Sequence, residues 1–565
     1  MPISFNINDS DFFCEGSGMD FLRLKAGLSE LLGAGQIKSV NPHLFSLPIA
    51  SASLASSIFN EICGSVPEEL RGETEMYSRH AAARIEAVRT ISERRISLLE
   101  LPWADKLDPV QAIAVSAMVT PMLSGLCLFD EQGIGKTATA VAAFDILRQR
   151  GDVDALIVVC PVTMKQAWKD EIQKFLSDKY KISIIEGLPG EKRRTALEPF
   201  DVLVTNFESI ESLLVPLKAV AGTKKIALIV DESFNVKNKD AVKSSAIREL
   251  RRSCVKGFVL CGTPAPNSSV DVIHQYDIAD NGYTFVGFIP PKDEEERTKA
   301  INLRIEDRGT TIRRLKEQVL PDLPGKQFNI VSVQMTGRQE SLYEDARRKL
   351  ELNLKSMDNA SFKKSLVAYF QQRSILLQIC ACPEAVDPSY FDTSAKLEKL
   401  DELVNRIVEK EGKKLIVWSF YRASLRNLMD RYQRFSPVLL DGSVPAKQRA
   451  ESVHRFQNDL DARICIANPA AAGAGVTLHS ASDAAYISFS NQAAHFLQSI
   501  DRIHRRGQKA SSVNYYFFIC KDTIEEKEMR RLREKELRQH ELLGDNVKWP
   551  NSLDDALSEL SRNDE

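Results

Sequence analysis

Residues 125–140 read GLCLFDEQGIGKTATA, and their order of apolar, glycine-rich and small residues sets the fold class of this 565-residue chain. The opening apolar run has the length of a buried strand. Gly133 and Gly135 follow it, and Lys136 and Thr137 begin a run with helical character. Glycines let backbone amides wrap an anion, and a helix N-terminus attracts negative charge. A strand, a glycine loop and a helix in this order predict a phosphate cradle at the edge of a parallel sheet.

The cradle departs from the general phosphate-loop pattern at one position, where this chain has Asp130 in place of glycine. A bare Gly-Lys-Thr also occurs in ordinary loop-to-helix turns, so the triplet alone leaves that alternative equally good. The strand before it and the helix after it favour a phosphate site. In that case Lys136 neutralises the β and γ phosphates, and the hydroxyl of Thr137 binds Mg²⁺.

Short runs rich in Val, Ile and Leu alternate with helical patterns over most of the chain. This alternation predicts the α/β class, with parallel sheets covered by helices. A first series of predicted strands comprises residues 125–129, 156–160, 201–205, 226–230 and 257–260. A second series comprises residues 414–419, 437–440, 463–467, 484–488 and 512–518. The segment 266–397 between them is largely helical and charged, so the pattern indicates two lobes.

An acidic pair, Asp231 and Glu232, directly follows the predicted strand 226–230. Groups at the carboxyl ends of parallel strands share one edge of the sheet with the cradle. Asp231 is suited to hold Mg²⁺ through water, and Glu232 to orient or deprotonate an attacking water. The alternative, a solvated acidic turn, is common for an isolated Asp-Glu, but the cradle upstream disfavours it.

Residues 498–508 read QSIDRIHRRGQ and place two arginines, Arg502 and Arg505, three residues apart. On a helix this spacing puts both guanidiniums on one face. A pair of arginines aimed at phosphate charge is suited to nucleotide hydrolysis. For His504, inside the segment, a structural hydrogen bond is a better prediction than acid–base chemistry.

Bulk composition describes an ordinary globular protein, with 43% hydrophobic and 27% charged residues and a net charge of −2. A near-neutral net charge does not indicate a nucleic-acid partner, which would need a local basic surface. The ten cysteines lack zinc-site spacing, and their dispersal fits a reducing compartment. We expect no zinc site, no signal peptide and no membrane-spanning segment.

The two ends of the chain are less informative. Residues 21–32 and 75–101 have helical patterns, which predict a mainly helical N-terminal region. Residues 523–543 form one charged helical pattern, and the arginines between Arg530 and Arg538 are best interpreted as its solvated face. Trp168 and Trp418 lie in apolar patterns, so core packing is a better prediction for both than base stacking.

Taken in order, these motifs resemble those of the Swi/Snf-like family of superfamily-two ATPases, which translocate on double-stranded DNA. The resemblance runs from residue 107 to residue 543. Its segments are LDPVQ (107–111), DEQGIGKT (130–137), VVCP (158–161), VTNF (204–207), DESF (231–234), GTP (262–264), RRLK (313–316), LQIC (377–380), SAKL (394–397), VWSF (417–420), GAGVTL (473–478), QSIDRIHRRGQ (498–508) and TIE (523–525).

The resemblance implies two RecA-like lobes that bind ATP and Mg²⁺ between them. Gln111 then becomes the adenine contact, and Asp130 belongs to the family's own first motif, which explains the missing glycine. Lobe two would bring Arg502 and Arg505 to the γ-phosphate, with Gly475 and Gln498 among its nucleotide-binding residues.

The resemblance also implies contacts with the DNA backbone, which give position and salt dependence but no sequence choice. For each hydroxyl among them, a local cap or turn bond is an equally good alternative. Phe234 stands where the family usually has a histidine that couples hydrolysis to movement, and Thr263 belongs to the same coupling motifs. The residues implied as DNA contacts are Thr163, Lys165, Thr205, Ser419 and Thr477.

The domain boundaries implied are an N-terminal accessory region, lobe one, helical protrusions with an inter-lobe linker, lobe two, and a brace helix with its tail. In that order they span residues 1–100, 101–285, 286–395, 396–522 and 523–565. The N-terminal region is a candidate site for a protein partner, and a monomer is expected. The compact chain indicates a bacterial or phage setting, hence the cytoplasm, or the nucleus if its source is eukaryotic.

The leading functional hypothesis is an ATP-dependent double-stranded DNA translocase that remodels or displaces bound complexes, in repair, modification or anti-phage defence. A strand-separating DNA or RNA helicase is the first alternative, which the resemblance disfavours. A degenerate ATPase acting as a binding scaffold is the second, and the intact Lys136, Asp231, Glu232, Arg502 and Arg505 disfavour it.

Overall fold

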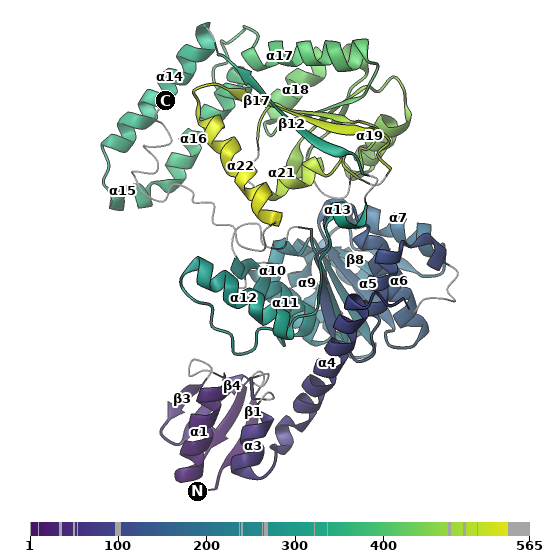
Figure 1. The fold of residues 1–565 in the computed structure, drawn as a ribbon, viewed down its shortest axis with the longest axis vertical. Coiled ribbons are helices and arrows are strands. Elements are labelled where there is room, and N and C mark those ends of the chain that lie inside the picture. The colour runs from purple at the N-terminus through teal and green to yellow at the C-terminus, as the bar shows by residue number, and fades with distance from the viewer. Residues whose placement is uncertain are drawn as a thin grey trace. The chain divides into compact units, whose positions relative to one another are not determined.

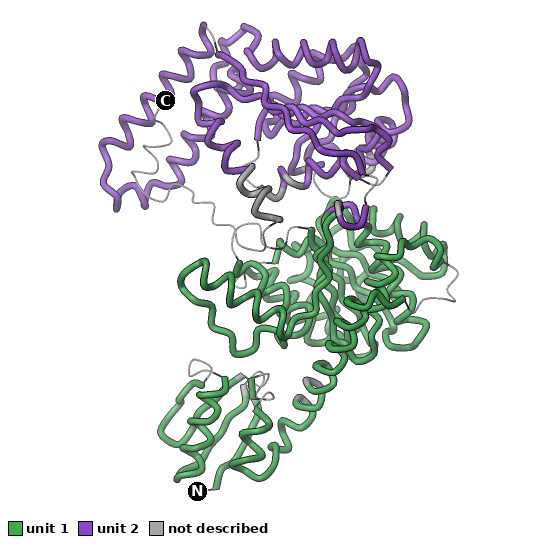
Figure 2. Tube along the Cα trace, in the orientation of Figure 1, with its two compact units in different colours: residues 1–131, 135–315 green, residues 132–134, 316–565 purple. Residues whose placement is uncertain are grey.

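The computed structural model divides the chain into two compact units (Figure 2). The first unit comprises residues 1–131 and 135–315, and the second comprises residues 132–134 and 316–565. The residues described are 2–8, 11–32, 37–48, 51–52, 55–96, 103–236, 238, 241–262, 264, 269–320, 323–335, 337–472, 476–489, 493–505 and 507–540. Among them, no helix is both long and apolar enough to cross a membrane.

The first unit begins with a four-stranded antiparallel sheet that the sequence analysis did not predict. Its order is β1-β2-β4-β3, with β1 (Ser4–Asn8), β2 (Asp11–Glu15), β3 (Lys38–Asn41) and β4 (Leu44–Pro48). These strands have at most five residues each, too few for a clear alternating pattern. A cluster of buried aromatic and aliphatic side chains, with Phe12, Phe45 and Phe59 in it, joins the sheet to its helices.

Helices contain more residues of this region than strands do, in line with its predicted helical character (Figure 1). They are α1 (Met19–Leu32), α3 (Ser56–Cys63) and α4 (Glu68–Ser92). The predicted helix 21–32 is confirmed by α1, whereas the one predicted over 75–101 begins earlier and ends at Ser92. Arg94, with a φ of 52°, adopts a left-handed conformation that cannot continue the helix.

A seven-stranded parallel sheet of order β11-β5-β10-β9-β6-β8-β7 is the centre of the first unit. The five predicted strands are confirmed to within one residue at each end, and all five are fully buried, as expected for a sheet covered on both faces. The unpredicted β7 and β11 have three and two residues. The strands are β5 (Gly125–Leu128), β6 (Ala155–Cys160), β7 (Ile182–Ile184), β8 (Val202–Asn206), β9 (Ile226–Asp231), β10 (Lys256–Leu260) and β11 (Thr311–Ile312).

The carboxyl ends of three neighbouring strands carry the predicted site. In the parallel register Leu260 of β10 pairs with Leu128 of β5 on one side and with Asp231 of β9 on the other, so these ends are level. The other α-helices of the first unit are α5 (Pro109–Met118), α6 (Lys136–Gln149), α7 (Lys165–Leu176), α8 (Pro189–Leu197), α9 (Ile210–Ala221), α10 (Val242–Arg252), α11 (Ile273–Asp280) and α12 (Glu294–Arg308).

The second unit contains a six-stranded parallel sheet of order β12-β17-β16-β13-β15-β14. The second series of predicted strands is confirmed, with ends shifted by at most two residues. Strand β12 falls in the segment predicted to be largely helical, and it pairs with β17 along nine residues (Figure 1). The strands are β12 (Gly325–Val333), β13 (Leu415–Trp418), β14 (Val438–Leu440), β15 (Ile464–Ala467), β16 (Asp483–Tyr486) and β17 (Ser512–Cys520).

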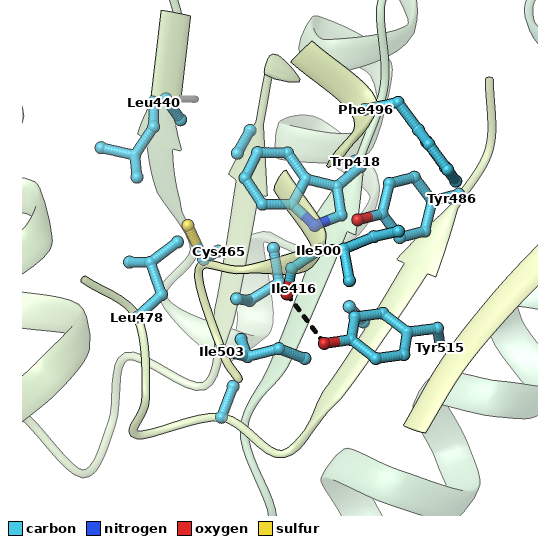
Figure 3. Packing of buried hydrophobic residues seen from close by; sticks show 14 of the residues in the cluster. Ile416, Trp418, Leu440, Cys465, Leu478, Tyr486, Phe496, Ile500, Ile503 and Tyr515 are labelled. Atoms are coloured by element: carbon cyan, nitrogen blue, oxygen red, sulfur yellow. Dashed lines mark hydrogen bonds between the residues drawn. The ribbon is translucent and has the colours of Figure 1, made fainter. Parts of the chain in front are cut away.

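Both faces of strand β13 are buried, because its alternate residues enter two different clusters. Ile416 and Trp418 pack into one, and Leu415 and Val417 into the other. The prediction that Trp418 is a core residue is therefore confirmed. Figure 3 shows the first cluster, where the Tyr515 hydroxyl donates a 2.7 Å hydrogen bond to the carbonyl of Ile500.

The predicted C-terminal charged helix is confirmed over its described part by α22 (Ile524–His540). Residues 541–543 of that prediction lie outside the described ranges. The other helices of the second unit are α13 (Lys316–Val319), α14 (Gly337–Lys355), α15 (Asn359–Lys364), α16 (Leu366–Ala381), α17 (Ala395–Val404), α18 (Arg422–Arg431), α19 (Ala446–Asn458), α20 (Pro469–Ala472) and α21 (Ala493–Ile500).

Candidate nucleotide site

The glycine loop between β5 and α6 has the backbone of an anion cradle. Gly133 and Gly135 have φ values of 93° and 103°, where other L-residues are strained. A Cβ at Gly135 would also lie 2.1 Å from Nε2 of Gln111. The predicted adenine contact therefore lies against the cradle. It is positioned by the first turn of α5, where the amide of Asp108 donates to Oε1 of Gln111 at 3.0 Å.

The ammonium group of Lys136 is buried, with the residue only 9% exposed. Its Nζ donates to the carbonyls of Asp130 (2.7 Å) and Glu131 (3.4 Å), which are neutral acceptors. A buried cation whose hydrogen bonds go to neutral acceptors gains strongly from an anion, because an ionised acceptor makes the stronger hydrogen bond. Thr137 follows at the N-terminus of α6 and is partly exposed.

The acidic pair lies at the carboxyl end of β9, with both side chains buried. Oδ1 of Asp231 accepts from the amide of Glu232, and Oδ2 accepts from Nε1 of Trp168, each at 2.9 Å. Burial, and then the charge of Glu232, raise the pKa of Asp231 to about 7, although Trp168 and Lys136 act in the opposite direction. Glu232 has a φ of 52°, the kind of backbone strain that concentrates at functional positions.

The hydrogen bond from Trp168 to Asp231 is the part of the site that sequence reasoning missed. Trp168 is fully buried, so the prediction that it is a core residue is confirmed. The two residues are far apart in the sequence and meet because β6, which precedes α7, lies beside β9 in the sheet. The one available signal was chemical: a buried indole N–H requires an acceptor.

The arginine segment belongs to the second unit. Helix α21 ends at Ile500, so Arg502 and Arg505 lie in turns beyond it, and the prediction of one helical face is wrong. The Arg502 carbonyl instead accepts the amide of Leu478 at 3.0 Å, a tertiary bond that replaces a helical one. The side chains nevertheless converge: Nη1 of each donates to the carbonyl of Val476, at 3.2 Å from Arg502 and 3.4 Å from Arg505.

Two neighbours of these arginines are anchored within the second unit. Oδ1 of Asp501 lies 2.6 Å from Nζ of Lys316. Burial alone would raise the pKa of Asp501, but Lys316 and Lys326 outweigh it and hold this pKa at about 2. Nε2 of His504 lies 2.9 Å from the carbonyl of Pro324, which confirms the predicted structural role.

The remaining predicted residues fall into three groups. Gln498 is buried, and its carbonyl accepts a 2.8 Å hydrogen bond from Nε of Arg502. Phe234 is half-buried in the short 3-10 helix Ser233–Val236. Thr263 and Gly475 lie outside the described residues.

The five residues expected to contact DNA differ in accessibility. Thr163 and Thr477 are partly exposed, and the Thr477 hydroxyl accepts a 2.9 Å hydrogen bond from Arg505. Lys165 is buried and donates to the carbonyl of Ile185 at 2.7 Å. Thr205 and Ser419 are fully buried. Contact with a phosphate stays a prediction for all five, and burial disfavours it for Lys165, Thr205 and Ser419.

Potential metal ligands also gather in the second unit, where Cys380, Cys520 and Glu525 lie close together and buried. Glu525 is already neutralised: its Oε1 lies 2.6 Å from Nζ of Lys396, and its Oε2 accepts the amide of Cys520. The Glu525 carboxylate, which a metal ion at this cluster would need, is therefore paired with the ammonium of Lys396.

Matches to family models cover both units. Residues 76–384 match the SNF2-related domain, and residues 395–507 match the helicase conserved C-terminal domain. The chain belongs to the SNF2-related family. This SNF2-related chain thus has the family and the fold class that its motifs predicted, two parallel-sheet α/β lobes of a helicase-type ATPase core.

Curated relatives of this SNF2-related chain include proteins from bacteria and animals. It is 25% identical over 440 residues to an uncharacterized ATP-dependent helicase of Mycoplasma pneumoniae, covering 76% of this chain and 41% of that one. It is 26% identical over 449 residues to the mouse chromodomain-helicase-DNA-binding protein 1-like, covering 73% and 47%. The chain spans about half the length of these relatives. Among solved structures, it is similar to the Sulfolobus solfataricus SWI2/SNF2 ATPase core in complex with dsDNA, with 20% identity, a TM-score of 0.35, and coverage of 80% and 96%.

Proposed function

We propose that this SNF2-related chain is a magnesium-dependent ATPase, stimulated by double-stranded DNA, that translocates along the duplex and displaces what is bound to it. One observation carries the ATPase proposal. The cradle lysine and the acidic pair follow strands of one sheet whose carboxyl ends are level. The hydrogen bonds of Lys136 and Asp231 go to neutral groups, and an ionised ligand would make stronger bonds to both.

The residues present fit a magnesium nucleotide. Lys136 would exchange its carbonyl acceptors for phosphate oxygens, with the amides of the glycine loop around them. Thr137 and Asp231 would hold Mg²⁺, which supplies neutralisation of phosphate charge. Glu232 would orient the attacking water, and Gln111, already against Gly135, would read the adenine. We assign Arg502 and Arg505 to the same reaction, as cations that stabilise the transferring phosphate.

DNA translocation and a partner for the N-terminal region complete the proposal. Support for the DNA partner comes from the family and from the printed name of the archaeal structure, whose core was solved with dsDNA. Thr163 and Thr477 are the best placed of the predicted phosphate contacts, since both are partly exposed.

The first experiment measures phosphate release from ATP with and without blunt double-stranded DNA. Lys136→Ala should abolish turnover, because no other group on the loop replaces the ammonium. Lys174→Ala is the matched control, since Lys174 on α7 is 73% exposed and forms only a 3.9 Å pair with Glu171. Turnover that is equal in wild type and Lys136→Ala would remove the ATPase assignment.

The second experiment separates the motor from its alternatives. A translocase displaces a triplex-forming strand from duplex DNA but does not separate tailed duplexes. Strand separation would instead favour the helicase alternative, and DNA binding without hydrolysis would favour the scaffold. Chelation of Mg²⁺ with EDTA should stop hydrolysis, and an excess of Mg²⁺ should restore it.

A further inference from the structure

Residues 314–316 join the two units. The side chain of Arg314 binds a residue that lies earlier in the sequence, and that of Lys316 binds a residue that lies later. The first unit ends at Leu315, and the second resumes at Lys316. Arg314 is bound to the start of the cradle in the first unit, whereas Lys316 is bound to the arginine segment of the second unit.

Arg314 holds two segments of the candidate site together. Its Nε donates to Oδ1 of Asp130 at 2.9 Å, and its Nη2 donates to Oδ2 of the same carboxylate. Its Nη1 donates to the carbonyl of Val110, in the first turn of α5 and next to Gln111. The backbone follows the same path, since the amide of Glu131 donates to the carbonyl of Arg314 at 3.0 Å. Arg314 thus fixes both the entry to the cradle and the helix that carries the adenine contact.

Asp130 lies between this arginine and the cradle lysine. Its carbonyl accepts the 2.7 Å hydrogen bond from Lys136, and its carboxylate, in a residue only 1% exposed, binds Arg314. If Lys136 moves to a phosphate, the Asp130 carbonyl loses that donor while the carboxylate stays with Arg314. Glycine, the residue of the general phosphate-loop pattern, could make no such link.

Lys316 makes the corresponding contacts in the second unit. It is 2% exposed, and its Nζ donates to Oδ1 of Asp501 at 2.6 Å and to the carbonyl of His504 at 3.1 Å. Asp501 immediately precedes Arg502, and His504 immediately precedes Arg505. The ammonium therefore holds the backbone from which both arginines project.

We propose, resting on the function proposed above, that Arg314 and Lys316 are positioning residues that couple the nucleotide cradle to the arginine segment through the backbone of Leu315. The fork on Asp130 requires the planar guanidinium, which lysine cannot reproduce. At position 316 one compact ammonium bonds both Asp501 and the His504 carbonyl, an arrangement that the longer, planar guanidinium of arginine does not reproduce.

The test uses the full chain and compares Arg314→Lys and Lys316→Met with wild type. Arg314→Lys should raise the KM for ATP about tenfold, because it loosens the cradle and α5. Lys316→Met should lower kcat with double-stranded DNA about tenfold, while the Kd of a fluorescent ATP analogue stays within about twofold. Triplex displacement per ATP hydrolysed should fall in both variants. Arg338→Lys is the control, since Arg338 forms an Arg–Asp pair on α14 that is 46% exposed at the arginine.

The outcomes separate this inference from the proposed function. If Lys136→Ala abolishes turnover while both new variants keep wild-type KM, kcat and displacement per ATP, the ATPase stands and the coupling role is overturned. If wild type does not hydrolyse ATP, both proposals fail. Should Lys316→Met lose its cooperative thermal transition, Lys316→Arg decides: it keeps the cation, so recovery of folding with kcat still about tenfold low sustains a positioning role, and full recovery of both overturns it.

Discussion

The cradle region and the base of helix α22 both bury charged side chains, but they hold those charges in different ways. At α22, Lys396 and Glu525 are 0% and 1% exposed at their side chains and lie 2.6 Å apart, and Arg373 and Glu528 form a second buried pair. In the cradle region, Lys136 donates to neutral carbonyls, and Asp231 accepts from an indole and an amide.

The difference separates structural charge from functional charge. A buried ion pair is complete in the folded chain, and removing one partner leaves the other uncompensated. A buried charge held by neutral dipoles is stabilised less, and the raised pKa of Asp231 reflects this. Groups of the second kind gain most from a ligand, so substitution should affect stability at α22 and catalysis at the cradle.

The largest effect on stability is expected for Lys396→Met. The variant leaves Glu525 buried beside two thiols and removes the donor to the Ile487 carbonyl. The free energy of unfolding should fall by about 3–5 kcal/mol, measured by urea denaturation of the second unit's transition. Lys399→Met is the control on the same helix, because its pair with Glu402 is 47% and 66% exposed, and it should change stability by under about 0.5 kcal/mol. Equal effects of the two variants would contradict a structural role for the buried pair.

Asp231→Asn should reduce the rate of hydrolysis strongly while leaving stability unchanged. Hydrolysis should fall at least about a hundredfold, roughly 2.7 kcal/mol of barrier, because the amide is a poor Mg²⁺ ligand. The unfolding transition should not weaken, since burial already disfavours the charged form of Asp231. A large loss of stability would mean that Asp231 is a structural residue.

A smaller effect on catalysis is expected for Trp168→Phe. The variant removes the hydrogen bond that orients Oδ2 of Asp231, so hydrolysis should fall about tenfold, with a higher apparent KM for Mg²⁺. Trp418→Phe is the matched control, because Trp418 is equally buried and its Nε1 has no hydrogen-bond partner among the described residues. Similar kinetics for the two variants would show that packing, not the hydrogen bond, matters at position 168.

The smallest effect concerns the acid sensitivity of the first unit. His80 on α4 contacts the hydroxyl of Ser124 at 2.8 Å, and burial, with Arg251 and Lys256, lowers the pKa of His80 to about 4. A lowered pKa means that the folded state binds the proton more weakly than the unfolded state. The His80 contribution is therefore complete above about pH 6.5 and is lost as the pH falls toward 4.

The free energy of unfolding that is lost on acidification should be at most about 1.4 kcal/mol per pH unit. Thermal unfolding between pH 7 and pH 5 measures it, and His80→Gln, which keeps a polar side chain, should flatten the profile. His43 is exposed, so His43→Gln should leave the profile unchanged. A profile that is equally steep without His80 would place the acid sensitivity elsewhere.

The extent to which the fold could be predicted depended on the composition of each strand. Strands made of apolar runs were found in both sheets, because these runs are distinct from the helical pattern around them. Strand β12 was missed because its residues alternate between exposed and half-buried environments and include Lys326, Gln327 and Asn329. Its pairing with β17 supplies what its own composition does not.

In the candidate site too, features set by neighbouring residues could be predicted, and those set by distant contacts could not. Local chemistry was sufficient for Gly135, Lys136 and the acidic pair, since a strand followed by a phosphate-binding turn specifies its own geometry. The conformation around Arg502 depends on a distant residue. Its carbonyl accepts a hydrogen bond from the amide of Leu478, which replaces the helical bond that the spacing predicted.

The order of apolar runs, glycine loops and charged residues was thus enough to establish two parallel-sheet lobes and to select the candidate nucleotide residues. These features depend on neighbours within a few positions, where backbone preference and hydrophobic period act directly. Packing between distant segments decided which buried charges are paired, which donor orients Asp231, and which residues Arg314 and Lys316 bind. Such contacts arise only when the sheet brings separated strands together, and no period in the sequence encodes them.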